Sequence, residues 1–151
     1  MSGELERLAY EVSLKALERQ ENVIDELRSR TGTLLAASSL SASFLGARAL
    51  DHPGGTWLGL IALGLFGVSV GSAVFVLLPR TRLILVLRGS EIFTPDLGGQ
   101  GLPETYRRLT YWIEAFLERN EPPIGRLFIF FRIAAGSSLG GAILWSVQLV
   151  T

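Results

Sequence analysis

The feature that most constrains this chain is an uncharged run of 22 residues at 57–78, WLGLIALGLFGVSVGSAVFVLL. A helix of that length extends about 33 Å, and the hydrocarbon core of a bilayer is about 30 Å thick. Pro79 and Arg80 follow the run directly and are expected to end the helix. The sequence therefore predicts a membrane-spanning helix at 57–78.

Two further stretches approach the length of a membrane span, at 33–50 and 133–150. The first is diluted by serines, whose hydroxyls can bond a backbone carbonyl one turn earlier and so be tolerated in lipid. The chain is 48% hydrophobic and only 19% charged, and a soluble domain of 151 residues could hardly bury three such helices on every side. We therefore predict an all-α integral membrane protein with three transmembrane helices.

The distribution of basic residues predicts which side of the membrane each part occupies. Five Arg and Lys residues precede the first span and seven lie between the second and third, whereas the DHPGG loop at 51–55 has only Arg48 nearby. By the positive-inside rule, the N-terminus is cytoplasmic and the C-terminus is outside. The first residues are charged and lack the apolar core of a signal peptide, so we expect the first span to drive insertion into the cell membrane.

Residues 1–31 are predicted to form a charged cytoplasmic helix that continues into a transmembrane hairpin at 32–79. Two apolar stripes run along this helix, the first marked by Leu5, Leu8 and Val12 and the second, at near-heptad spacing, by Tyr10, Leu17, Ile24 and Leu27. The helix is expected to pack either on the cytoplasmic segment of its own chain or on copies of itself.

Residues 80–126 are predicted to be a second cytoplasmic segment, followed by the third span within 127–151. The short apolar run of 82–94 fits a β-hairpin, or else a helical extension of the second span. An amphipathic helix is predicted at 103–120, with an apolar face formed by Leu109, Trp112, Ile113, Phe116 and Leu117. Its opposite face mixes acids and bases, so we favour packing on protein over the bilayer interface. Pro122 and Pro123 are expected to break this helix before the third span.

Small residues on the predicted spans indicate where helices approach closely. The candidate helix-packing residues are Gly64, Gly67 and Gly71 on the second span and Gly136 and Gly140 on the third. Such residues let two backbones come together in lipid, where dispersion and weak hydrogen bonds hold helices. Contacts within one chain and contacts between chains are both compatible with this pattern.

Three residues are candidates for interfacial anchors. Trp57 and Trp145 fall at the same outer edge of the predicted topology, where aromatic belts form. Arg132 lies near the start of the third span, from which its side chain can reach the headgroups. The alternative for Arg132 is a buried position, lining a pore or paired with an acid.

The chain offers no residues for catalysis. The second and third spans contain no Asp, Glu, Lys or His, which a proton relay or an ion-coupled transporter would need. There is no Cys, His52 is the single His, and no P-loop, HExxH, GxSxG or CxxC motif occurs. We therefore predict a protein that is not an enzyme, with no catalytic, cofactor-binding or metal-binding residues. The 14 basic and 14 acidic residues cancel, which argues against a nucleic-acid partner.

The layout of residues 5–80 resembles that of small bacterial membrane effectors. A charged helix leads through ELRSRTGTLLAASSL (26–40) into a tight membrane hairpin. In this the chain is similar to SLATT domains and to the Pycsar membrane effectors of anti-phage signalling, although 80–126 and the third span depart from a plain two-span effector. The resemblance implies an inner-membrane protein of antiviral defence that damages the host membrane after a signal.

We thus expect a non-enzymatic membrane protein that self-associates through its small-residue helix faces. Its expected partners are the lipid bilayer and further copies of itself, and the resemblance adds permeabilisation of the membrane as its effect. The alternative is an accessory or scaffold subunit of a larger membrane complex, which the lack of a polar pathway through the spans favours.

Overall fold

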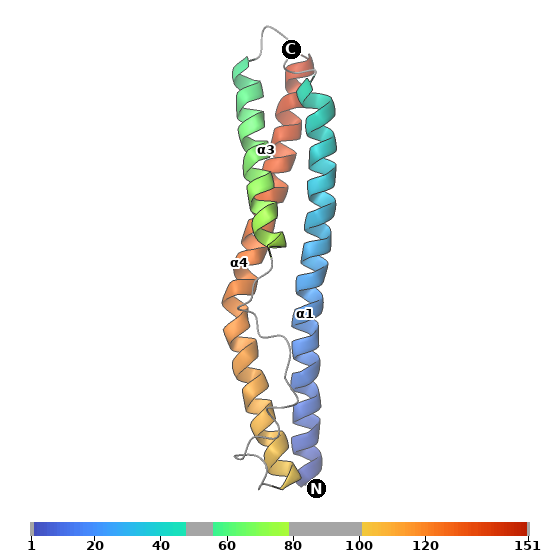
Figure 1. Ribbon diagram of the computed structural model, residues 1–151, viewed down its shortest axis with the longest axis vertical. Helices are drawn as coiled ribbons and strands as arrows, with labels where there is room; N and C mark the ends of the chain where they lie inside the picture. Colours follow the sequence, from blue (N-terminus) through green and yellow to red (C-terminus); the bar gives the residue numbers. More distant parts are fainter. Residues whose placement is uncertain (1, 48–55, 79–100, 151) are drawn as a thin grey trace. The chain divides into compact units, whose positions relative to one another are not determined.

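The computed structural model describes residues 2–47, 56–78 and 101–150, and nearly all of them are helical (Figure 1). The elements are α1 (Ser2–Ser41), a π-helical turn η1 (Ala42–Gly46), α3 (Thr56–Leu77) and α4 (Leu102–Val150). No strand occurs in these ranges, so the all-α prediction is confirmed for the described residues. The predicted β-hairpin at 82–94 and the loop at 51–55 lie outside them.

Helix α3 is the element that the sequence defines best. The structure begins it at Thr56 and ends it at Leu77, one residue before the predicted bounds at each end. Its residues are apolar or small throughout, and Pro79 follows the helix. Proline disfavours helical conformation in the residue before it, which explains why the helix ends there.

Helix α1 confirms that the charged N-terminal helix continues into the apolar stretch after it. It is 40 residues long. Ion pairs one turn apart support its charged part: Arg7 donates to Glu11 at 2.9 Å and Arg30 donates to Glu26 at 2.5 Å. The helix therefore has no boundary near residue 31, where the charged composition ends.

The predicted break at Pro122 and Pro123 is wrong. Helix α4 runs from Leu102 to Val150 with both prolines inside it, so the amphipathic helix and the third span form one helix. Each proline removes an intrahelical hydrogen bond, and a proline inside a helix costs about 3 kcal/mol. Packing on both sides offsets this cost, because Asn120 before the prolines and Leu127 after them are each 1% exposed.

The described residues divide into two compact units. The two-helix unit contains residues 2–25 of α1 and 101–124 at the start of α4. The three-helix unit contains residues 26–47, 56–78 and 125–150.

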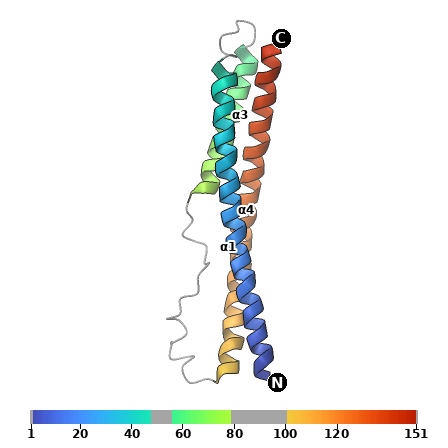
Figure 2. The same ribbon diagram turned by 90° about the vertical axis from the view of Figure 1, so that its right-hand side faces the viewer.

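In the two-helix unit, α1 and α4 run in the same direction (Figure 2). Contacts join early residues of one helix to early residues of the other: Gly3 lies by Pro103, Tyr10 by Tyr106 and Gln20 by Asn120. The ring centroids of the two tyrosines are 5.4 Å apart. The two helices are therefore parallel neighbours, although about a hundred residues separate their paired positions.

The interface of the two-helix unit uses residues three, four or seven positions apart on each helix, as in a coiled coil. Its buried members are Ser13, Leu17 and Ile24 on α1 and Leu109, Thr110, Ile113 and Asn120 on α4. The prediction that the amphipathic helix packs on protein is confirmed. Of the two alternatives left open for the N-terminal helix, the structure shows packing on the cytoplasmic segment of its own chain, through the second stripe. The first stripe is exposed at Leu5, Leu8 and Val12.

A polar pair lies in this interface. Gln20 Nε2 donates to the carbonyl oxygen of Leu117 at 3.2 Å, and Asn120 Nδ2 donates to Gln20 Oε1 at 3.5 Å. Sliding one helix by a turn would break both of these hydrogen bonds. The pair therefore favours a single register between the two helices.

In the three-helix unit, α3 runs opposite to α1 and α4 (Figures 1 and 2). Contacts between α3 and α4 pair later residues with earlier ones: Phe75 with Phe130, Ser69 with Ala134 and Ala62 with Gly141. The antiparallel arrangement predicted for the two helices flanking residues 51–55 is confirmed.

Two hydrophobic clusters lie near the two ends of α3. The first contains Leu27, Val76 and Leu127, with Phe130 and Phe131 packed against it. The second contains Ala62 and Trp145, with Ala42, Leu45, Phe66 and Leu144 packed against it. Each cluster draws on all three helical segments, so these segments lie alongside one another over most of the length of α3.

Two of the described helices are long and apolar enough to cross a membrane, over Trp57–Leu77 and within Leu102–Val150. The stretch at 33–50 is not one of them, and its last three residues lie outside the described ranges. The structure thus supports two of the three predicted spans.

Candidate functional site

Helix α3 has two opposite faces with different surroundings. The buried inner face consists of Gly59, Ala62, Ser69, Ala73 and Val76. The exposed face, here called the glycine face, consists of Leu60, Gly64, Gly67, Gly71, Val74 and Leu78. Along each face the residues recur three, four or seven positions apart, which keeps them on one side of the helix. Two positions along a helix correspond to a rotation of about 200°, so residues offset by two, such as Ala62 and Gly64, point in opposite directions. One side of α3 therefore packs against described residues of the chain, while the other side is exposed among them.

The three glycines predicted to pack helices on α3 make no such contact inside the described part of the chain. A Cβ built on Gly64, Gly67 or Gly71 would meet no atom within 4 Å. The large residues at the two ends of this face are also exposed, Leu60 to 64% and Leu78 to 54%. The glycine face is thus a continuous open surface without a polar side chain.

On α4, the two predicted packing glycines behave differently from each other. A Cβ on Gly140 would lie 3.5 Å from Leu65 Cδ1, whereas a Cβ on Gly136 would meet nothing within 4 Å. The closest approach belongs to Gly141, where a Cβ would lie 3.4 Å from the carbonyl oxygen of Ala62. The contact between α3 and α4 therefore uses Gly140 and Gly141, and Gly136 is exposed.

Hydroxyl groups link the helices of the three-helix unit. Ser69 Oγ on α3 donates to the carbonyl oxygen of Ala134 at 2.9 Å, and the hydroxyls of Ser38 and Ser138 lie 2.5 Å apart between α1 and α4. Ser69 was not among the residues predicted to pack helices. Its position opposite the glycine face was the available signal, since a hydroxyl in an apolar helix is best placed where it can reach another helix.

The two predicted tryptophan anchors have opposite environments. Trp57 is 64% exposed. Trp145 is 5% exposed and belongs to the hydrophobic cluster with Ala62. The structure therefore places Trp145 in the core of the three-helix unit rather than on its surface.

Arg132 is exposed on the outer face of α4. The large exposed neighbours on this face are apolar: Phe128, Ile129, Leu139, Ile143, Val147 and Val150. Arg132 is the only charged residue from 127 to 150, and it forms no ion pair with a described residue. The predicted alternative of a buried arginine is therefore not what the structure shows.

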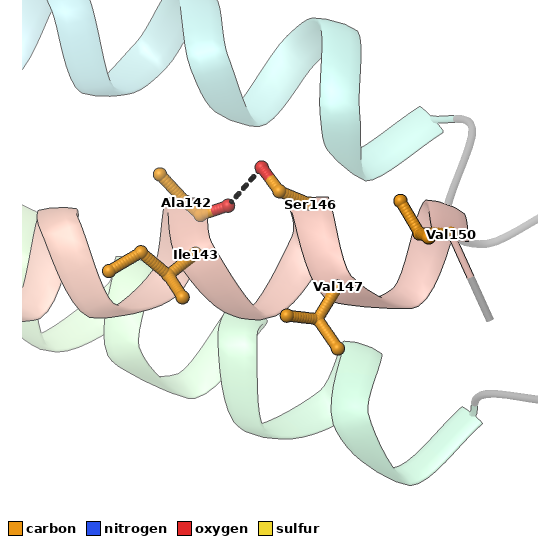
Figure 3. Close-up of a pocket in the computed structure, with 5 residues that line it drawn as sticks. All are labelled: Ala142, Ile143, Ser146, Val147 and Val150. Atoms are coloured by element: carbon orange, nitrogen blue, oxygen red, sulfur yellow. Dashed lines mark hydrogen bonds between the residues drawn. The ribbon is translucent and has the colours of Figure 1, made fainter.

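The end of α4 carries a shallow apolar depression (Figure 3). Its lining comes from one helix only, and consists of Ala142, Ile143, Ser146, Val147 and Val150. The hydroxyl of Ser146 donates to the carbonyl oxygen of Ala142 at 2.8 Å. Its hydrogen-bonding capacity is thus directed to its own helix, and the depression presents an open apolar surface rather than a shaped ligand site.

No group of three or more potential metal ligands occurs among the described residues. The exposed acids for which ion pairs are observed, Glu11, Glu26 and Glu104, each pair with an arginine within one helical turn. The glycine face of α3 and the outer face of α4 therefore stand as the candidate functional surfaces. No protein-family model, characterised protein or solved structure matches this chain.

Proposed function

We propose that this chain is a non-enzymatic integral membrane protein that self-associates through the glycine face of α3. The observation that carries the proposal is the exposure of that face over the whole helix, with three glycines that contact nothing inside the described chain. An apolar surface of this kind is unfavourable in water but ordinary in lipid. Glycines in lipid let the backbones of two helices come close, which strengthens dispersion between them.

The proposal includes α1 as a third span beside the two that are apolar enough by composition. Leu27 clusters with Val76 near one end of α3, and Leu45 packs against the cluster of Ala62 and Trp145 near the other end. A segment that follows α3 over this length shares its depth in a membrane.

The exposed surface at the end of α1 and in η1 supports the same placement. Leu40 and Phe44 are exposed to 62% and 74%. The exposed serines Ser39 and Ser43 donate to carbonyl oxygens four residues earlier, at 2.8 and 2.9 Å. Serines bonded in this way leave no unsatisfied donor facing lipid.

The distribution of basic residues supports a cytoplasmic N-terminus and an external C-terminus for this three-span topology. The two-helix unit then lies in the cytoplasm, where a signal could act on it. The resemblance to SLATT and Pycsar effectors extends the proposal to antiviral defence, with assembly of the spans permeabilising the membrane.

A second candidate is an accessory subunit of a larger membrane complex. It is favoured by aromatic surface on the two-helix unit, where Tyr111 is 64% and Trp112 39% exposed. Purification in a mild detergent separates the two candidates. Self-association yields complexes of this chain alone, and an accessory role yields a defined second protein in fixed ratio.

Self-association through the glycine face is tested by cysteine cross-linking, because the chain has no Cys of its own. Leu60→Cys places a thiol on the glycine face, and Leu139→Cys places one on α4 with nearly equal exposure, 64% and 65%. Oxidation of membranes containing the full chain should give disulfide-linked dimers for Leu60→Cys and few for Leu139→Cys. Equal yields from the two sites would contradict the assignment of the face.

A second substitution links the cross-link to the glycines. Gly67→Leu in the Leu60→Cys background should abolish most of the dimer, because the leucine holds the helices apart. The control Val68→Leu adds bulk beside the face and should leave the yield unchanged. Membrane permeabilisation is followed with a potential-sensitive dye in cells, where Gly67→Leu should also suppress depolarisation.

A further inference from the structure

Arg132 stands alone on an otherwise apolar surface of α4. Phe128 and Ile129 precede it on the same face, exposed to 41% and 57%, and Gly136 follows one turn later with nothing within 4 Å. The guanidinium forms no ion pair with a described residue. Its positive charge is therefore not paired with an acid in the described part of the chain.

The register of the helices gives the depth of Arg132 within the proposed membrane span. Leu127 clusters with Val76 near the end of α3, so this level marks the cytoplasmic end of the three-helix unit. Arg132 lies five residues further along α4, or about 7.5 Å deeper. This position lies in the hydrocarbon of the cytoplasmic leaflet, between its headgroups and the middle of the bilayer.

The direction of the side chain brings it back toward the headgroups. In an α-helix every Cα–Cβ bond tilts toward the N-terminus of the helix, and long side chains cover the preceding turn. For Arg132 that turn contains Phe128, on the cytoplasmic side. An arginine at this depth extends along the helix until its guanidinium reaches the phosphate level.

We propose that Arg132 and the apolar turn before it bind an anionic phospholipid of the cytoplasmic leaflet. The guanidinium binds the headgroup phosphate by donating two parallel N–H···O hydrogen bonds, an arrangement that its planar geometry favours. Phe128 and Ile129 contact the acyl-chain carbons nearest the headgroup. The inference rests on the membrane placement of the proposed function and adds a lipid headgroup class to it.

The test uses the full chain with Gly125→Cys carrying a fluorophore, at an exposed position two turns before Arg132 on the same side of α4, reconstituted in phosphatidylcholine vesicles. Nitroxide-labelled phosphatidylglycerol or nitroxide-labelled phosphatidylcholine, alike except for the headgroup, is added at equal mole fraction. Quenching reports which lipid occupies the site beside Arg132. We expect about fivefold preference for phosphatidylglycerol, which corresponds to one basic residue at a membrane surface.

Three variants assign that preference to the site. Arg132→Gln should abolish it, Arg132→Lys should retain most of it, and Arg126→Gln, an exposed arginine on a different side of α4, should leave it unchanged. Equal loss in Arg126→Gln would overturn the site in favour of general surface charge. Adding millimolar inorganic phosphate should leave the preference unchanged. Loss of the preference would show that the site binds free phosphate without lipid, which would overturn the proposed lipid site.

The outcomes separate this inference from the proposed function. Equal quenching by the two lipids overturns headgroup binding while membrane insertion and cross-linking through Leu60→Cys remain intact. Absence of quenching by either lipid overturns the inference together with the membrane placement of α4. A chain that fails to cross-link through the glycine face but prefers phosphatidylglycerol supports the inference and contradicts self-association.

Discussion

The indole ring of Trp145 packs against Gly46, with Trp145 Cζ2 3.5 Å from the position that a Cβ on Gly46 would occupy. Gly46 ends the π-helical turn η1, and both residues are buried. The wider turn of a π-helix is uncommon and often marks a local packing requirement. Here the absence of a side chain at Gly46 makes room for the largest ring in the core of the three-helix unit.

The burial of Trp145 predicts a large loss of stability when it is truncated. Trp145→Ala should lower the free energy of unfolding by about 3–5 kcal/mol, the usual cost of deleting a buried aromatic side chain. Trp57→Ala is the matched control and should change it by less than about 1 kcal/mol, because Trp57 is 64% exposed. Unfolding by SDS in mixed micelles, followed by circular dichroism, measures both values. Equal losses would contradict the placement of Trp145 in the core.

Gly141 and Gly136 should differ in their tolerance of bulk. Gly141→Leu forces a side chain against the backbone of Ala62, 3.4 Å from the first added carbon, and should destabilise the three-helix unit by about 1–3 kcal/mol. Gly136→Leu meets no neighbour within 4 Å and should be neutral or slightly stabilising, since leucine favours helix more than glycine does. The same SDS titration compares the two variants. A greater loss for Gly136→Leu would mean that α4 packs with a different face.

The contact between Ser38 and Ser138 should couple α1 to α4. In a double-mutant cycle with Ser38→Ala and Ser138→Ala, we expect a coupling energy of about 0.6 kcal/mol, the average for interhelical hydrogen bonds in membranes. Ser39→Ala in place of Ser38→Ala is the control. Both hydroxyls donate to a carbonyl of their own helix, but Ser38 is buried and also contacts Ser138, whereas Ser39 is exposed and should show no coupling. Zero coupling for the first pair would contradict the observed distance of 2.5 Å between the two hydroxyls.

Asn120 should determine the register of the two-helix unit. Asn120→Ala leaves the amide oxygen of Gln20 without its donor and should cost about 1–3 kcal/mol. Hydrogen exchange of the full chain should then show faster exchange over 2–25 and 102–124 and unchanged exchange over α3. Arg108→Ala, on the exposed side of α4, is the control. If exchange over 2–25 and 102–124 in Asn120→Ala is no faster than in the unsubstituted chain, the polar pair does not stabilise this interface.

Local composition determined what could be predicted about the helices. The bounds of α3 were predicted to within one residue, because an uncharged run closed by Pro79 leaves few alternatives. The continuity of α4 could not be predicted, since prolines normally end a helix and the packing of Asn120 and Leu127 that sustains this one involves residues distant in the sequence. Periodicity correctly selected Leu17 and Ile24 as packing residues, but it left open whether their partner was the cytoplasmic segment of the same chain or a second copy.

The glycines show why a packing motif does not by itself identify its contact. Gly67 and Gly140 occur in equally small-residue segments, and only the environment in the folded chain distinguishes them. Gly140 faces Leu65, whereas Gly67 lies on the side of α3 that no other described helix covers. A sequence pattern reports that backbones can approach there, but which backbone does so depends on the rotation of each helix about its axis.

The opposition of the two faces of α3 restricts the symmetry of any assembly. Two chains that meet through the same patch are related by a twofold axis, and such a contact is saturated once a pair has formed. A closed ring requires a head-to-tail contact, in which the glycine face of one chain meets a different surface of the next. The exposed side of α4 around Gly136 would supply such a surface. The number of chains in the native assembly therefore distinguishes a symmetric pair from a ring that could surround an opening in the bilayer.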